Sequence, residues 1–201
     1  MKKVSPRPRG RPLSFDRDQV LDAAVQVFWD KGYEGASLDD LTQAMGINRP
    51  SLYATFGNKH SLFMQAIDRY VATITSTQLA PLMDMSDIRQ AVSGYFAELV
   101  RCVASQDWPA GCFVVCVAAE TSERDEMVRS KVSELLEDAE TFIALRIAEA
   151  APGDPSVQVE NPRKLARMIV AVGQGLAARA RAGAPKDELL DLANDFVERL
   201  V

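Results

Sequence analysis

Apolar residues recur along almost the whole chain at the spacing of an α-helix, and this pattern restricts the possible folds more than any other feature of the sequence. No stretch alternates apolar and polar residues over the length of a strand. Glycines and prolines, among them Gly32, Gly46, Gly57, Pro81 and Pro185, divide the pattern into segments. The predicted helices cover about residues 16–32, 37–46, 50–56, 58–79, 86–103, 112–119, 122–150, 161–182 and 185–201. The chain is therefore predicted to be all-α, with about nine helices.

Length and composition exclude several classes of protein. The 201 residues are 47% hydrophobic and 25% charged, which is typical of a globular chain of one large domain or two small ones. No apolar run approaches the roughly 20 residues that cross a bilayer, and the proline-rich, basic start does not fit a signal peptide. Three cysteines, an odd number, favour a reducing compartment. We expect a cytoplasmic protein that does not interact with membranes.

Patterns typical of catalysis and metal binding are not found in the sequence. A single histidine, His60, argues against most histidine-based metal sites and the usual catalytic triads. The sequence shows no nucleophile–base pair, no phosphate-binding glycine loop and no metal-ligand spacing. We expect no enzyme activity, no cofactor and no bound metal. His60 itself is expected as a solvated side chain in the first turn of the helix over residues 58–79.

Charge is unevenly distributed along the chain, although the net value is only −5. Residues 1–11 hold five basic and no acidic residues, residues 1–60 hold nine and seven, and residues 61–201 hold 14 and 21. A basic start and a near-neutral segment therefore precede an acidic remainder. Because local charge governs nucleic-acid binding, the acidic total does not exclude it.

Residues 37–59 hold the most specific pattern in the chain, two short helices joined by a tight turn. Gly46 allows the turn and Ile47 fills the joint, as in a helix-turn-helix. On the second helix Leu52 and Phe56 lie four residues apart and are predicted to face the core. The residues then left to face a DNA groove are Arg49, Ser51, Tyr53, Ala54 and Thr55.

The turn glycines, aromatic residues and lysine of this segment follow in the order Gly32-Tyr33-x-x-Ala36-Ser37-Leu38-x-x-Leu41-x-x-Ala44-x-Gly46-Ile47-x-x-x-Ser51-Leu52-Tyr53-x-x-Phe56-x-Asn58-Lys59-x-x-Leu62-Phe63. This run resembles the DNA-binding domain of the TetR family of bacterial transcriptional regulators, over residues 15–65 almost without a gap. The resemblance implies an all-helical homodimer of two-domain chains, and the basic residues ahead of the first domain are expected to form a disordered arm, so that each chain has three parts. These parts are a basic arm (residues 1–14), a DNA-binding head (residues 15–65) and a ligand-binding and dimerisation body (residues 66–201).

The resemblance also implies roles for single residues of the head. Tyr53 and Lys59 match family residues that reach backbone phosphates, and such contacts position a protein without reading sequence. Ser37 begins a helix, where its hydroxyl and the free amides can hold a phosphate. Two of these residues have a purely structural alternative to phosphate binding. Ser37 would act only as a helix cap, and Tyr53 would only pack its ring against the protein.

Base readout is expected from the second helix of the helix-turn-helix. Arg49, Ser51 and Thr55 are the predicted base readers, and Asn48, the last residue of the turn, is included among the DNA-contacting residues. Arg49 suits guanine through a bidentate contact worth roughly 1–3 kcal/mol. Ala54 offers only a contact to a thymine methyl group, which leaves the operator sequence open.

A second DNA-binding pattern lies in the arm. Arg9-Gly10-Arg11-Pro12 matches the core of an AT-hook, in which two guanidinium groups lie along a narrow A·T minor groove. We expect Arg9 and Arg11 to contact the minor groove, with a solubilising tail as the alternative.

The last two helices are the predicted dimer interface. Their small and apolar residues are Ala171, Gly173, Gly175, Ala177, Ala178 and Ala180 on one helix, and Leu189, Leu190, Leu192, Ala193, Phe196, Val197 and Leu200 on the other. Small side chains let a partner backbone approach closely, and two-fold symmetry matches a palindromic operator. The alternative is that both helices pack within one subunit.

A pocket for a small-molecule effector is expected among the middle helices. Its candidate lining residues are Tyr95, Trp108, Phe113, Cys116, Met127, Phe142, Met168 and Gln174. Aromatic and methionine side chains suit an apolar ligand, and Gln174 is a polar group in an apolar stretch. Cys112 and Cys116 lie four residues apart, so a thiol or Cu(I) switch is an alternative input, against ordinary core packing.

These patterns together predict a dimeric one-component transcriptional regulator, a repressor that binds a palindromic double-stranded operator and is released by an unidentified small molecule. Three alternatives stay open. They are a DNA-binding protein without an effector, the thiol or metal switch through Cys112 and Cys116, and a helical small-molecule-binding enzyme.

Overall fold

The computed structural model describes residues 15–84, 87–150 and 161–199. Every regular element within these ranges is helical, which confirms the predicted all-α fold. Residues of the arm and of the segment 151–160, and the last two residues of the chain, lie outside the described part.

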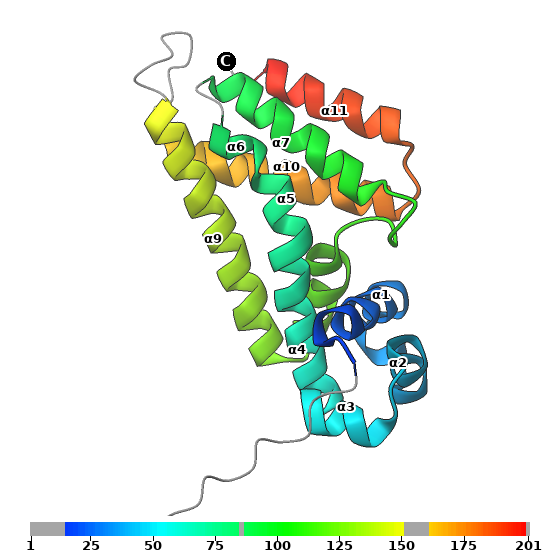
Figure 1. Cartoon of the computed structure of the whole chain (residues 1–201). Coiled ribbons are helices and arrows are strands. Elements are labelled where there is room, and N and C mark those ends of the chain that lie inside the picture. The colour runs from blue at the N-terminus through cyan, green and yellow to red at the C-terminus, as the bar shows by residue number, and fades with distance from the viewer. Residues whose placement is uncertain (1–14, 85–86, 151–160, 200–201) are drawn as a thin grey trace, which may run out of the picture.

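Four helices form one end of the molecule (Figure 1). These are α1 (Arg17–Gly35), α2 (Leu38–Met45), α3 (Arg49–Phe56) and α4 (Lys59–Tyr70). Polar side chains at Asp16, Ser37, Asn48 and Asn58 cap their N-termini, each by accepting a hydrogen bond from a first-turn amide. Gly46 adopts a φ of 63° between α2 and α3, a left-handed conformation that glycine takes at little cost. The predicted helix-turn-helix is therefore present.

Helix α4 continues without a break into a π-helical segment, η1 (Val71–Thr75), and then into α5 (Ser76–Leu79). These three elements form one rod, for which we keep the name connecting rod (residues 59–79). The helix predicted over residues 58–79 corresponds to it, whereas the π-helical turns were not predicted. The boundary predicted between head and body falls inside α4, so the chain passes between them as helix and not as a linker.

The seven further described elements belong to the body: α6 (Pro81–Asp84), α7 (Ile88–Val103), η2 (Val114–Ala118), α8 (Ala119–Thr121), α9 (Glu126–Ala150), α10 (Pro162–Arg181) and α11 (Lys186–Glu198). Helix α7 packs against α10 and α11, and α9 packs against α10. Helix α11 lies at the outer edge of the body, far from α2 and α3 (Figure 1).

Two boundaries differ from the sequence prediction. Pro81 does not simply end the rod but begins α6, a position that proline tolerates because the first turn of a helix needs no amide donor. Helix α9 begins at Glu126 instead of Ser122, because Asp125 caps it by accepting hydrogen bonds from the amides of Met127 and Val128.

The buried residues form two clusters, and the first joins the head to the body. It holds the apolar residues of α1 to α4 together with residues of η2 and of the start of α9, among them Phe113, Val117 and Val128. The chain at Gly111 approaches α10 closely because this residue, at a φ of 91°, has no side chain. A Cβ atom there would lie 2.9 Å from Cys116 Sγ and 3.0 Å from Arg181 Cβ. The second cluster lies among α7, α9, α10 and α11.

Candidate functional site

Helix α3 buries one face and exposes the other. Leu52 and Phe56 are buried in the first cluster, as their spacing predicts. On the opposite side Tyr53 is 48% exposed, Arg49 and Ala54 are exposed, and Ser51 and Thr55 are partly exposed. An uncovered helix face of this width fits the major groove of DNA.

Two residues at the start of α3 already have partners. Arg49 Nη2 lies 2.7 Å from Asp39 Oδ1 of α2, in an ion pair whose two side chains are both exposed. Such a pair contributes only about 0–1 kcal/mol, so a nucleic-acid acceptor can replace the carboxylate. Asn48 is the N-cap of α3, where its Oδ1 accepts a 2.8 Å hydrogen bond from the Ser51 amide. Its side-chain oxygen therefore has a structural role.

Ser37 takes part in a capping box at the start of α2. Its hydroxyl donates to Asp40 Oδ2 at 2.6 Å and accepts from the Asp40 amide at 3.0 Å. Lys31 Nζ lies 2.5 Å from the other carboxylate oxygen. Hydrogen bonds from Lys31 and then from Ser37 lower the pKa of Asp40 to about 2. Ser37 is thus a helix cap, the structural alternative to its predicted phosphate contact, and its hydroxyl already has hydrogen-bond partners.

The start of α4 places a cation beside the recognition helix. Lys59 Nζ lies 4.6 Å from the centre of the Tyr33 ring, a cation–π contact that orients the side chain. The expectation for His60 was wrong, because it is not a solvated side chain: its Nε2 lies 2.7 Å from Asp125 Oδ2. The amide of Val128, and then His60, hold the pKa of Asp125 below its ordinary value. The predicted arm contacts, Arg9 and Arg11, fall outside the described residues.

An aromatic cluster joins head and body. Phe113, the residue just before η2, is fully buried, and its ring centre lies 5.7 Å from those of Phe63 and Tyr70 and 6.3 Å from that of Trp29. The guanidinium of Arg181, from α10, donates a 3.1 Å hydrogen bond to the carbonyl of Trp29 near the end of α1. We call this contact region the head–body joint; it consists of Trp29 and Phe63 of the head, Tyr70 at the end of α4, and Phe113 and Arg181 of the body. It holds the head against the body through packed side chains.

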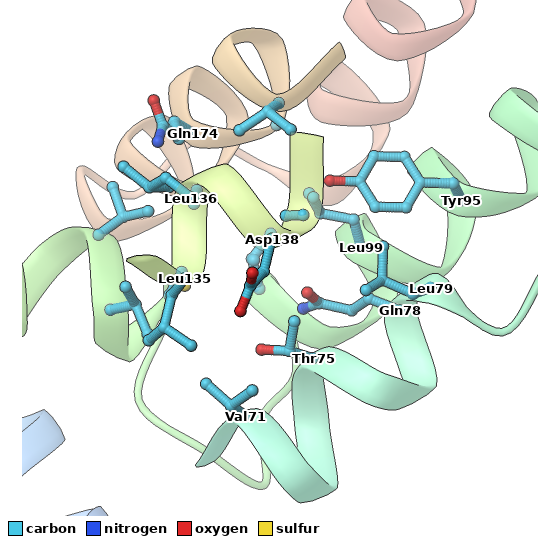
Figure 2. A pocket seen from close by; sticks show the side chains of 18 of the residues that line it. Val71, Thr75, Gln78, Leu79, Tyr95, Leu99, Leu135, Leu136, Asp138 and Gln174 are labelled. Atoms are coloured by element: carbon cyan, nitrogen blue, oxygen red, sulfur yellow. The ribbon is translucent and has the colours of Figure 1, made fainter. Parts of the chain in front are cut away.

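A cavity of about 310 Å³ opens in the body between the connecting rod, α7, η2, α9 and α10 (Figure 2). Its lining is mostly apolar, and three of the predicted effector residues, Tyr95, Phe142 and Gln174, belong to it. Both π-helical segments contribute to the wall, η1 through Val71 and η2 through Val114. Such segments are frequent at functional sites.

The other five predicted residues do not line this cavity. Trp108 stacks on the buried tryptophan of α1 at a ring-centre distance of 6.0 Å, and Phe113 lies in the head–body joint. Cys116 is turned toward the chain at Gly111. Met127 and Met168 are 63% and 47% exposed on the surface. Their aromatic or thioether character alone did not distinguish a cavity wall from a packed joint or an exposed face.

Three polar residues of the cavity wall were not predicted: Thr75 of η1, Gln78 of α5 and Asp138 of α9. Figure 2 shows all three pointing toward the middle of the cavity. A signal for the first two existed in the sequence. Residues 70–83 form a long uncharged stretch in which Thr75 and Gln78 lie one turn apart on a helix that is otherwise partly apolar.

The three cysteines are free thiols. Cys112 accepts a 3.3 Å hydrogen bond from the Tyr70 hydroxyl, and burial raises the pKa of its thiol. A raised pKa keeps the thiol protonated and poorly reactive. Among the described residues, no three histidine, cysteine, aspartate or glutamate side chains gather as metal ligands would.

Helices α10 and α11 expose part of the predicted dimer stripe and bury the rest. Gly173, Ala177, Leu189 and other residues pack inside the subunit, as the alternative reading of this segment had it. The residues that stay exposed are Ala171, Gly175 and Ala178 of α10 and Leu192 of α11. A Cβ atom on Gly175 would meet nothing within 4 Å. Leu200 lies outside the described residues.

No helix in the described ranges has the length and apolar character needed to span a membrane.

Comparison with known proteins identifies both halves of the chain. Residues 20–66 match the family model described as "Bacterial regulatory proteins, tetR family", and residues 90–193 match "Tetracyclin repressor-like, C-terminal domain". The chain is 34% identical over 192 residues to the HTH-type transcriptional repressor ComR of Escherichia coli, covering 93% of this chain and 90% of ComR. It is 29% identical over 187 residues to the repressor BdcR of the same species, with the same two coverages.

A solved structure supports the same assignment. A cysteine mutant of the TetR family transcriptional regulator CifR, complexed with 26-base-pair double-strand operator DNA, superposes with a TM-score of 0.86 at 33% identity and covers 95% of this chain and 100% of that one. The helix-turn-helix, the body that follows it and these relatives agree, and the chain belongs to the TetR family of helix-turn-helix transcriptional regulators.

Proposed function

We propose that the protein is a homodimeric repressor whose hold on a palindromic operator is released when a small molecule enters the body cavity. The observation that carries this proposal is the connecting rod. One end of the rod begins at Lys59, directly after α3, and the other end, through Val71, Thr75 and Gln78, forms a wall of the cavity. A ligand in the cavity therefore contacts the same helix that carries the head.

The proposed DNA contacts divide into two kinds. Arg49, Ser51 and Thr55 on the free face of α3 read base edges, whereas Tyr53 and Lys59 hold the phosphate backbone. At Ser37 the hydroxyl is committed to Asp40, so we assign phosphate binding there to backbone amides of the first turn of α2. Asn48 supports the recognition helix as its cap.

Dimerisation is proposed through the exposed residues of α10 and α11. The small residues Ala171, Gly175 and Ala178 allow a partner helix to approach closely, and Leu192 adds an exposed apolar side chain on α11. Two heads related by a two-fold axis can then reach half-sites about 34–36 Å apart, one turn of DNA.

Release is proposed to act through α9 as well as through the rod. Two contacts tie these elements together: His60 Nε2 lies 2.7 Å from Asp125, the residue that caps α9, and Asp68 forms a 2.8 Å ion pair with Lys131 of α9. Further along α9, Leu135, Leu136 and Phe142 line the cavity. A shift of α9 on ligand binding would thus be passed to the first turn of α4, next to Lys59. A ligand can change operator affinity only through a difference in its affinity for the two arrangements.

The relatives support this reading. ComR and BdcR are named repressors, and CifR was solved on operator DNA. Because these relatives are transcriptional regulators, we propose regulation and not enzyme catalysis for this chain. No observation in the described residues favours the thiol or metal switch, since the Cys112 thiol accepts a hydrogen bond from Tyr70, its pKa is raised, and no group of metal ligands gathers there.

The proposal is tested by selecting bound duplexes from a random DNA pool at moderate salt. We expect a two-fold symmetric motif, and we expect A·T enrichment at its flanks if Arg9 and Arg11 enter the minor groove. A truncated chain that begins at residue 15 is the matched control for the arm, because it should keep the symmetric motif and lose the flanks. A folded dimer that enriches no motif, or an asymmetric one, would overturn the proposal.

A further inference from the structure

The cavity wall contains a buried amide whose nitrogen meets no nitrogen or oxygen acceptor among the described residues. Gln78 is only 6% exposed, and its Nε2 makes no hydrogen bond. Its amide lies near the Cys102 thiol, where burial raises the pKa of the thiol and the amide acts in the opposite direction. A thiol is a weak acceptor, and an amide nitrogen has two N–H groups. Since buried donors are nearly always satisfied in native proteins, an acceptor is missing here.

Two further side chains of the wall keep their hydroxyl groups uncommitted. The neighbours of Thr75 on the rod, Thr73, Ser76 and Thr77, each donate at 2.8 Å to a carbonyl in the preceding turn. Thr75 forms no such bond within the described residues and points into the cavity (Figure 2). A hydroxyl normally makes this back-bond when nothing else is available to it.

Tyr95 supplies the third uncommitted group. It is 7% exposed, and burial raises the pKa of its hydroxyl well above the ordinary value, so the group stays protonated and acts as a donor. No hydrogen bond joins this hydroxyl to another described residue, and Figure 2 shows it directed into the cavity from α7.

The charge of the wall limits the ligand as much as its donors do. Asp138 contributes a carboxylate, and no lysine or arginine lines the cavity. Asp138 is exposed and acts on Lys131 outside the wall, so its repulsion of an anion is modest, but an anionic ligand would find no cation to pair with among the lining residues. A cationic amine would pair with Asp138 but would leave the buried Gln78 donor unsatisfied, which is costly.

We infer that the effector is an uncharged, largely apolar molecule with a carbonyl oxygen, which accepts hydrogen bonds from Gln78 and Tyr95. This inference rests on the proposed function and adds the chemical class of the effector. The carbonyl oxygen has two lone pairs and can accept from two donors at once. The volume of about 310 Å³ lies at the lower end of the range for ligand pockets, so the molecule is small.

Four phenylalkyl probes of similar size that differ in their polar group test the inference. The full-length protein is titrated with benzylacetone, butylbenzene, hydrocinnamate and phenylbutylamine, which carry a ketone, no polar group, a carboxylate and an amine. Calorimetric affinity and the shift in melting temperature are measured, because a ligand that binds only the folded state raises its stability. We expect benzylacetone to bind at least threefold more tightly than the other three. Butanone and cyclohexanone extend the ketone series to smaller sizes.

Two conservative variants locate the contact. Gln78→Leu and Tyr95→Phe are each expected to weaken benzylacetone about three- to tenfold, the net value of one hydrogen bond, and to leave butylbenzene unchanged or tighter. Gln90→Leu, an exposed change on α7, is the matched control and should alter neither. If one cavity variant fails to fold, the other still decides the question.

The inference is overturned if the hydrocarbon binds as tightly as the ketone, if the carboxylate or the amine binds most tightly, or if no ketone binds. Operator binding is measured on the same preparations. If the protein binds its selected operator but does not prefer the ketone, the proposed chemical class of the effector is wrong and the proposed function still stands. A protein that binds the ketone and no operator contradicts the proposed function instead.

Discussion

The head–body joint can be tested by shortening Phe113, a residue that holds the head on the body without lining the cavity. The ring is fully buried, and three aromatic rings surround it, with centres 5.7 to 6.3 Å away. Phe113→Ala leaves a void between elements of the head and the body. Phe113→Leu keeps most of the volume and removes the aromatic contacts.

The expected loss follows from this environment. Removing a buried phenylalanine ring costs about 3–5 kcal/mol of unfolding free energy. Aromatic pairs add roughly 0.5–1.5 kcal/mol each beyond burial, so we expect the alanine variant in the upper half of that range. The leucine variant should lose about 1–2 kcal/mol, because it keeps a large apolar side chain. The total unfolding free energy of a domain is about 5–15 kcal/mol, so only the leucine variant is expected to stay folded well enough for binding assays.

The chain carries its own reporters for this measurement. Both of its tryptophans, Trp29 and Trp108, stack on each other at the joint, with ring centres 6.0 Å apart. Urea unfolding followed by circular dichroism gives the loss of stability, and tryptophan emission of the native state reports the packing of the joint itself. We expect Phe113→Leu to shift the native emission.

The control is Phe96→Leu in the second cluster. Phe96 is equally buried and contacts Tyr95 and Phe196, in a cluster that contains neither tryptophan. It should lower stability by a similar amount and leave the native emission unchanged. The reasoning is refuted if Phe113→Ala costs less than about 1 kcal/mol, since such a value is typical of a surface site, or if both leucine variants change the emission alike.

Three further predictions concern the surface of the molecule. Arg49→Ala should relax the sequence preference of operator binding, whereas Lys59→Ala should weaken all sequences alike and reduce the salt slope by about one, as measured by titrations at several salt concentrations. Gly175→Glu should abolish dimers in sedimentation experiments without unfolding the subunit, while the exposed control Ala148→Glu should not, and a dimeric glutamate variant would disprove the assigned interface. Because the pKa of Asp40 is lowered to about 2, its contribution to stability is present above its ordinary pKa and is lost as the pH falls toward 2. The melting temperatures of wild type and Asp40→Asn should therefore differ at neutral pH and converge in acid, and a constant difference would contradict this.

The helices of the head could be predicted because their signals are local. Ser37, Asn48 and Asn58 cap helices that begin at the next residue, and Gly46 marks the turn that the sequence indicates. Leu52 and Phe56 face the core at the spacing that a helix requires. Each of these signals involves residues no more than one or two turns apart, so no knowledge of the tertiary fold is needed to interpret it.

The cavity could be predicted only in part because its wall depends on the tertiary packing of distant segments. Phe113 and Phe142 look alike in the sequence, yet one fills the head–body joint and the other lines the cavity. Thr75 and Gln78 become informative only when α7 and α9 are known to face them. The contact between His60 and Asp125 likewise joins positions 65 residues apart, and neither neighbourhood indicates the other.

Shared packing of head and body determines how an effector can act on this protein. The connecting rod is helical throughout and the first buried cluster spans both parts, so the head has to move together with the elements that hold it. Moving an equilibrium from 1:99 to 99:1 requires about 5.5 kcal/mol of differential binding. Ligands yield roughly 0.3–1.5 kcal/mol per non-hydrogen atom in total, and the cavity of about 310 Å³ admits only a small one. A small effector cannot deform a strongly preferred arrangement, because most of its binding energy would have to be differential. In the proposed mechanism the two arrangements would therefore lie close in free energy before the ligand binds, and the proposed hydrogen bonds at Gln78 and Tyr95 would supply about 1–3 kcal/mol of the preference.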